Sequence, residues 1–172
     1  RKNRVRSIAL SVQREYGKLF TTLGVFHATP GELGQWKAKN DEAIALDKRD
    51  SGLYVINGIL HFLMGDMQES WNAIRKAQKC APTADPSPDF CAAFLHFFNG
   101  EFRKGRSSYK VALAKKGSYN RELIVDLVEF IQQTLDQYPD KFQFHYALGI
   151  LNEQRLDPSR SLASYKLFIE KA

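Results

Sequence analysis

A repeat of 34 to 35 residues constrains the fold of this 172-residue chain more than any other feature of its sequence. Each copy carries a small residue, a turn glycine and an alanine at fixed spacing, and the two best copies hold Gly58, Gly65 and Ala77, then Ala93, Gly100 and Ala112. An earlier copy with Gly24, Gly31 and Ala43 lies 34 residues before the first of these. A fourth copy with Gly149 begins 56 residues after Ala93, and 56 = 34 + 22 implies a 22-residue insertion. Such a period indicates stacked supersecondary units.

Each copy divides into two predicted helices around a short turn. In the best copy the helices cover residues 53–64 and 68–79, the turn is Gly65-Asp66, and Pro82 closes the unit. A glycine in this place is typical of a helix C-cap that needs a positive φ. The small residues allow close helix packing, and Ile74, Tyr109 and Tyr165 are expected to fill the seam. The pattern predicts an all-α chain without appreciable sheet.

This pattern resembles the tetratricopeptide (TPR) repeat, a 34-residue helix-turn-helix unit with these small, turn, aromatic and proline positions. The resemblance covers residues 17–119, as three units, and residues 142–172, as a fourth. It implies that residues 1–172 form a single right-handed α-solenoid of antiparallel helix hairpins. Another type of α-solenoid built from similar hairpins stays open as an alternative.

Two segments fall outside the repeat units. Residues 1–16 are expected to contain a leading basic amphipathic helix, because residues 5, 8, 9, 12 and 16 are apolar at helical spacing. Residues 120–141 are expected to hold an extra long helix over 120–138, with one apolar face. Either segment could cover part of the solenoid.

The resemblance assigns the concave surface of the solenoid to the first helix of each unit. The apolar positions that this assignment predicts as a partner-binding groove are Val55, Ile59, Phe62, Leu63, Phe90, Phe94, Phe97, Phe98 and Tyr146. Two readings of this patch are open. An external peptide or helix covers it, or the chain buries it through its own leading helix, through the helix at 120–138, or through deeper superhelical packing of the repeats.

The basic character of the chain is concentrated at its start. The formal net charge is +6, and residues 1–18 hold six basic side chains against one acidic, or 6 − 1 = +5, which leaves 6 − 5 = +1 for the rest. The basic arm is Arg1, Lys2, Arg4 and Arg6. It is typical of a solvated helix end, and alternatives are a phosphate contact or the flank of a membrane helix. Nucleic acid is not favoured as a partner.

No arrangement typical of an enzyme stands out, so neither a cofactor, a metal nor a small-molecule substrate is predicted. His27, His61 and His96 recur with the repeat and are expected to pack inside it, because equivalent helices are too far apart for three imidazoles to share one ion. Cys80 and Cys91 are expected to be free thiols rather than a disulfide.

The longest uncharged apolar stretch, residues 52–64, is shorter than the ~20 residues that span a bilayer. Association with a membrane is therefore expected only through a segment outside this chain. No targeting signal fixes the location, and the cytoplasm is favoured.

The sequence thus predicts a protein–protein interaction module, or one part of a scaffold, that binds an apolar peptide or helix of another protein in its concave groove. The alternatives are a non-catalytic regulatory or membrane-anchored TPR segment of a larger protein, or nucleic-acid contact through the basic arm.

Overall fold

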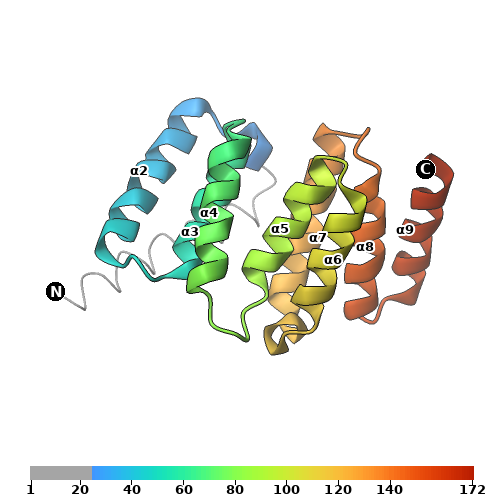
Figure 1. The fold of residues 1–172 in the computed structure, drawn as a ribbon. Coiled ribbons are helices and arrows are strands. Elements are labelled where there is room, and N and C mark those ends of the chain that lie inside the picture. The colour runs from blue at the N-terminus through green and yellow to red at the C-terminus, as the bar shows by residue number, and fades with distance from the viewer. Residues whose placement is uncertain (1–24) are drawn as a thin grey trace. The chain divides into compact units, whose positions relative to one another are not determined.

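The structure, a computed structural model, describes residues 25–172 (Figure 1). Over this range the chain forms helices and no strand, which confirms the predicted all-α class. The elements are the 3₁₀ helices η1 (Val25–His27) and η2 (Lys116–Tyr119) and the α-helices α2 (Pro30–Leu46), α3 (Ser51–Leu63), α4 (Met67–Cys80), α5 (Ser87–Phe98), α6 (Phe102–Leu113), α7 (Arg121–Gln137), α8 (Gln143–Gln154) and α9 (Pro158–Lys171).

The chain divides into two compact units, residues 1–83 and residues 84–172. The described part of the first unit holds η1 and α2 to α4, and the second unit holds α5, α6, η2 and α7 to α9. Helices α3 and α4 follow the predicted hairpin boundaries closely, and α7 corresponds to the predicted extra helix.

Helix α2 departs from the expected first repeat copy. The repeat spacing places Gly31 at a turn between two helices, but this residue lies in the first turn of α2. The helix begins earlier because Thr29 and Glu32 form a capping box, in which the Glu32 backbone N–H donates to Thr29 Oγ1 at 3.2 Å and the Thr29 N–H donates to Glu32 Oε2 at 2.8 Å. Pro30 then supplies the first helical residue. The expected turn at Gly31 is therefore wrong.

Three hairpins share one turn geometry, which explains most of the repeat. In α3–α4 the Gly65 N–H donates to Phe62 O at 3.0 Å and the Asp66 N–H donates to His61 O at 2.9 Å. The same pair of bonds recurs at Gly100 and Glu101 between α5 and α6, and at Leu156 and Asp157 between α8 and α9. These bonds satisfy the last carbonyls of the first helix and require a positive φ at the residue that ends it. Gly65, Gly100 and Leu156 all have one, at 81°, 75° and 58°.

The small residues of the repeat allow each pair of helices to approach closely. A Cβ atom placed on Gly58 would lie 2.6 Å from Cδ1 of Ile74, and one on Gly149 would lie 2.6 Å from Cδ1 of Tyr165. Both distances are shorter than side chains tolerate. The predicted pairing of a small residue on the first helix with a large one on the second is therefore present in the α3–α4 and α8–α9 hairpins.

A serine hydroxyl joins the two helices at the same contact. Ser70 Oγ donates to the Gly58 carbonyl at 2.7 Å, and Ser161 Oγ donates to the Gly149 carbonyl at 3.0 Å. Both serines are buried, so these bonds satisfy polar groups that have no access to water. The backbone approach at each glycine thus also makes an interhelical hydrogen bond possible.

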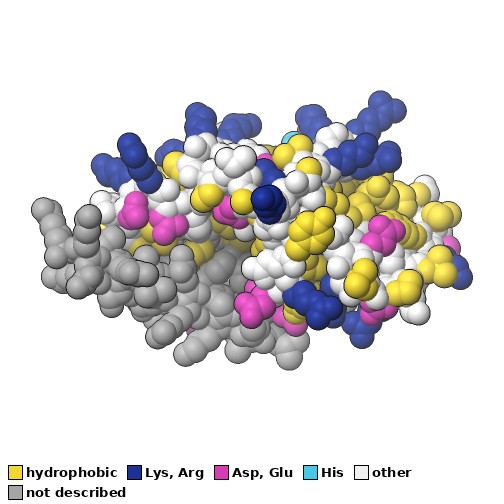
Figure 2. Space-filling view, turned by 90° about the horizontal axis from the view of Figure 1, so that it is seen from below, with side chains coloured by type: hydrophobic (Ala, Val, Ile, Leu, Met, Phe, Trp, Pro, Cys, Tyr) yellow, Lys and Arg dark blue, Asp and Glu magenta, His cyan; other side chains and the backbone are white. Residues whose placement is uncertain are grey.

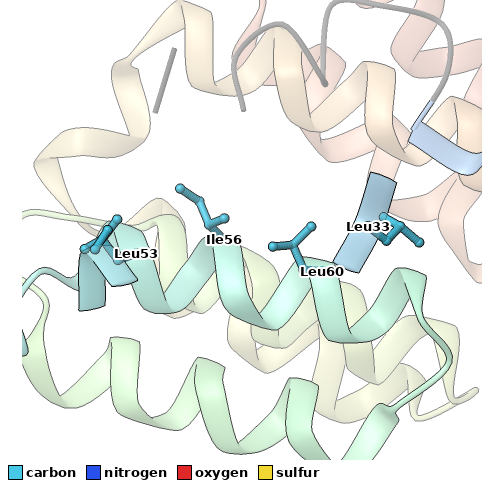
Figure 3. Packing of buried hydrophobic residues seen from close by; sticks show 5 residues of the cluster. Leu33, Leu53, Ile56 and Leu60 are labelled. Carbon is cyan, nitrogen blue, oxygen red and sulfur yellow. The ribbon is translucent and has the colours of Figure 1, made fainter. Parts of the chain in front are cut away.

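The first unit has an aliphatic core between α2 and α3. Figure 3 shows Leu53, Ile56 and Leu60 along one side of α3, with Leu33 of α2 close to them. Buried Asn40 joins the same two helices, because its Nδ2 donates to the Leu53 carbonyl at 3.0 Å. This bond explains why a polar residue is tolerated inside α2.

The extra helix α7 determines the direction in which the α8–α9 hairpin runs in the second unit. Helices α5 and α7 run the same way, and α8 returns in the opposite direction (Figure 1). Ring contacts join the middle of α5 to both later helices, since Phe94 lies 4.9 Å from Phe130 of α7 and 4.9 Å from Phe144 of α8, measured between centroids. The α8–α9 hairpin is therefore inverted relative to α5–α6.

Candidate interaction surface

The predicted groove residues on α5 are mostly core residues of the second unit. Phe90, Phe94 and Phe97 are all buried, and Phe90 and Phe97 each lie 5.5 Å from the ring of Tyr109 on α6. Phe98 is half-buried beside Tyr138, at 5.0 Å between ring centroids. Helices α6, α7 and α8 thus surround this aromatic face, and its buried rings offer no open surface within the unit.

The other predicted groove residues have intermediate positions. In the first unit Val55, Ile59 and Leu63 lie half-buried along α3, whereas Phe62 is buried with Phe26 at an edge-to-face distance of 6.4 Å. In the second unit Tyr146 is half-buried within an aromatic cluster. Helix α3 therefore keeps a partly open apolar stripe. Arg1, Lys2, Arg4 and Arg6 of the basic arm lie outside the described residues.

The repeated histidines have separate surroundings in the structure. His27 is exposed in η1, His61 is buried in α3, and His96 Nδ1 lies 2.6 Å from Glu101 Oε2 across the α5–α6 turn. Hydrogen bonds from Lys104 and then His96 lower the pKa of the Glu101 carboxyl. Within residues 25–172 no three His, Cys, Asp or Glu side chains are arranged to hold a metal ion.

The two cysteines are free thiols. Burial, together with the nearby charges of Asp85 and Asp89, raises the pKa of Cys91 to about 12. At neutral pH this thiol stays protonated and is a poor nucleophile. The side chain therefore behaves as a small packing residue rather than as a reactive group.

The largest exposed apolar side chains of the second unit include two on the outer face of α9. Leu162 is 56% exposed and Ile169 is 72% exposed, seven residues later on the same helix. Their positions differ by about 20° around the helix axis, because seven residues complete almost two turns. Figure 2 shows hydrophobic side chains gathered at the right of that view, where Figure 1 places α8 and α9.

An aromatic cluster packs against the inner face of α9, the face directed toward the rest of the unit. Tyr165 and Phe168 face the unit, and the ring of Tyr146 on α8 lies 5.7 Å from Tyr165 and 5.5 Å from Phe168. Phe102, at the start of α6, stacks on Phe168 at 5.3 Å. Burial and the neighbouring Glu153 carboxylate, with which Tyr165 shares a hydrogen bond, raise the pKa of that phenol, so it remains neutral at neutral pH. The inner face of α9 is therefore firmly packed, and this packing holds the outer face in a fixed position.

The turn before α9 exposes a further apolar side chain. Leu156 is 81% exposed and occupies the left-handed position that glycine fills in the other two hairpins. A bulky residue with positive φ costs about 1 kcal/mol relative to glycine. Neither its exposure nor its backbone conformation favours leucine here. Strained positions of this kind are found more often at functional sites than elsewhere.

The sequence-based predictions did not include the α9 surface, although the sequence contains a signal for it. Comparison of the second helices at the repeat spacing aligns Leu162 and Ile169 with Trp71 and Gln78 in α4, and with Arg106 and Leu113 in α6. Only α9 has an aliphatic residue at both positions. This contrast is visible in the sequence when the outer faces of the second helices are compared, and not only the inner positions that recur in the repeat.

Comparison with known proteins gives no family assignment. The sequence matches no protein-family model, and no curated protein is significantly similar to it. None of the helices in the described part of the chain has the length and apolar character needed to cross a membrane.

Proposed function

We propose that this chain is a non-catalytic protein-interaction module built from TPR-like helix hairpins. The shared turn and the close small-to-large contact between paired helices support the TPR-like reading, because each follows the positions that the repeat predicts. The proposed right-handed solenoid includes α7 as a helix inserted between the second and third complete hairpins. Its partner is another protein or a peptide segment, and no cofactor or small-molecule substrate is needed.

The exposed aliphatic face of α9 is the single observation that carries this function. Leu162 and Ile169 lie in the same stripe and are both more than half exposed. Exposed apolar side chains that share one helix face mark contact sites more often than scattered ones do. The contact surface that we propose is therefore the outer face of α9.

Affinity capture with matched variants tests this function. The double variant Leu162→Ser with Ile169→Ser should lose the proteins that the unaltered chain retains. Leu167→Ser is the control, because Leu167 is also exposed on α9 but lies about 140° around the helix from Leu162. Each captured protein is then purified and titrated against all three chains by calorimetry. Equal affinity for all three chains would exclude α9 as the contact surface.

A further inference from the structure

We infer that the outer face of α9 binds an amphipathic helix that places an acidic side chain between two apolar ones. This inference rests on the proposed function and adds the chemical class of the partner. A cation flanks the stripe, because Lys166 lies between Leu162 and Ile169 along the helix axis and about 40° from Leu162 and about 60° from Ile169 around it. Among the described residues Lys166 makes neither an ion pair nor a hydrogen bond.

The spacing of the stripe fits a helix as the occupant. Leu162 and Ile169 are separated by about 10 Å along the axis, which is the rise of seven helical residues. A helix with apolar residues at i and i+7 matches this distance, and its residue at i+3 or i+4 then faces Lys166. A carboxylate at that position completes the contact.

The overall charge of α9 also favours an acidic partner. The helix carries three basic side chains, Arg160, Lys166 and Lys171, and one acidic side chain, Glu170. Arg160 Nε already lies 3.4 Å from Asp157, whereas no such pair engages Lys166. A basic partner helix would place like charges together as the apolar side chains dock, which opposes association.

The same lysine argues against a second copy of this chain as the occupant. A symmetric contact that pairs Leu162 of one α9 with Ile169 of the other places the two-fold axis next to Lys166. The two ammonium groups would then be neighbours beside an apolar contact. Their repulsion and the loss of their hydration both oppose such a dimer.

A pair of labelled synthetic helices tests the inference. Both are 21-residue peptides with Leu at heptad positions a and d, and they carry either Glu or Lys at positions e and g. Fluorescence anisotropy with the full 172-residue chain should show at least ten-fold tighter binding of the Glu peptide, and the difference should shrink as salt rises. Lys166→Glu should reverse this preference.

The control separates the α9 site from the general positive charge of the chain. Lys110→Glu makes the same change in net charge at the equivalent position of α6, and it should leave the preference for the Glu peptide intact. Circular dichroism confirms that both variants fold. Equal effects of the two variants, or no binding of either peptide, would overturn the inference.

Two further outcomes distinguish this inference from the proposed function. If both peptides bind equally, and both are lost with Leu162→Ser and Ile169→Ser, the contact surface stands but the acidic partner does not. If sedimentation equilibrium shows a dimer that Leu162→Ser abolishes, the occupant is a second copy and the inference is overturned.

Discussion

In the α5–α6 hairpin the aromatic face of the first helix is covered by α7 and α8, whereas in the α8–α9 hairpin the outer face of the second helix is open. Both hairpins use the same turn, and in both a glycine lies close to a ring of the paired helix, Gly105 to Phe97 and Gly149 to Tyr165. The repeat therefore determines how two helices pair, while the next helix in the unit determines which apolar face remains exposed.

The largest expected effect contrasts buried and exposed apolar side chains in these two hairpins. Phe94→Ser and Phe97→Ser should each lower the free energy of unfolding by about 3–5 kcal/mol, as Tyr109→Ser should, because each removes a buried ring and leaves a cavity. Leu162→Ser and Ile169→Ser should change it by less than about 0.5 kcal/mol. Thermal melts followed by circular dichroism measure all five variants.

Tryptophan fluorescence provides the internal control for these melts. Trp36 and Trp71, the only tryptophans of the chain, both belong to the first unit. A variant of the second unit should therefore shift the circular dichroism transition more than the fluorescence transition. Small losses for Phe94→Ser and Phe97→Ser would show that their rings are not core residues, and would restore α5 as a contact surface.

A second prediction concerns the close contact inside α8–α9. Gly149→Ala should destabilise the chain by about 1–3 kcal/mol, because the new methyl group overlaps the Tyr165 ring. Gly34→Ala in α2 is the matched control, since a Cβ there has no neighbour within 4 Å. That control should stabilise by up to about 1 kcal/mol through helix propensity alone. Chemical denaturation compares them, and stabilisation by both variants would refute the close packing.

The third prediction exchanges the turn residues of the two hairpins. Leu156→Gly should raise the free energy of unfolding by about 1 kcal/mol, because glycine adopts the positive φ of 58° without steric cost. Gly100→Leu should lower it by about 1–2 kcal/mol for the opposite reason. Urea titrations measure the free energy of unfolding of both variants and so test the predicted gain and the predicted loss. A loss of stability in Leu156→Gly would mean that the leucine side chain contributes to folding despite its exposure.

The smallest effect is a pH dependence that has a different window in each hairpin. Burial, and then the charge of Lys171, lower the pKa of His145 on α8, so the folded state favours the neutral imidazole. Its stabilising contribution is complete above the unfolded value of about 6.5 and is lost as pH falls through the lowered pKa. His145→Gln should flatten the pH dependence of the melting temperature over this range.

Glu101 provides the contrast in the α5–α6 turn. Its lowered pKa means that its contribution is present above the unfolded value of about 4.3 and is lost at still lower pH. Glu101→Gln should therefore flatten the acid limb of the curve, below the unfolded value of about 4.3. An unchanged acid limb in Glu101→Gln would contradict this assignment.

The helices of the hairpins could be predicted from the sequence because their causes are local. Gly65 and Gly100 terminate helices through their backbone conformation, and the apolar period of residues 120–138 is enough to predict α7. The start of α2 was misplaced because the capping box at Thr29 competes with the turn that Gly31 suggests. In each case the signal lies within a few residues of the element that it determines.

The surfaces were harder to predict because they depend on which helices meet. The phenylalanines of α5 have the same helical spacing whether a partner or the helices α7 and α8 cover them, and the positions of Phe130 and Phe144 distinguish the two cases. The sequence between Leu162 and Ile169, Ala-Ser-Tyr-Lys-Leu-Phe, mixes polar with apolar residues, so the exposed pair does not stand out from the apolar residues that face the unit. Both side chains are exposed because, among residues 25–172, no helix packs on the outer face of α9.

The inversion of α8–α9 has an electrostatic consequence for the second unit. Its five α-helices alternate in direction, so three helix dipoles point one way and two point the other way (Figure 1). In an even number of alternating helices the dipoles would cancel. Because α7 makes the number odd, one helix dipole is left uncompensated, which is equivalent to about half a unit charge of opposite sign at the two ends of the unit. The end that holds the first residues of α5, α7 and α9 is therefore the more positive, and a carboxylate of a docked helix would gain most near the start of α9.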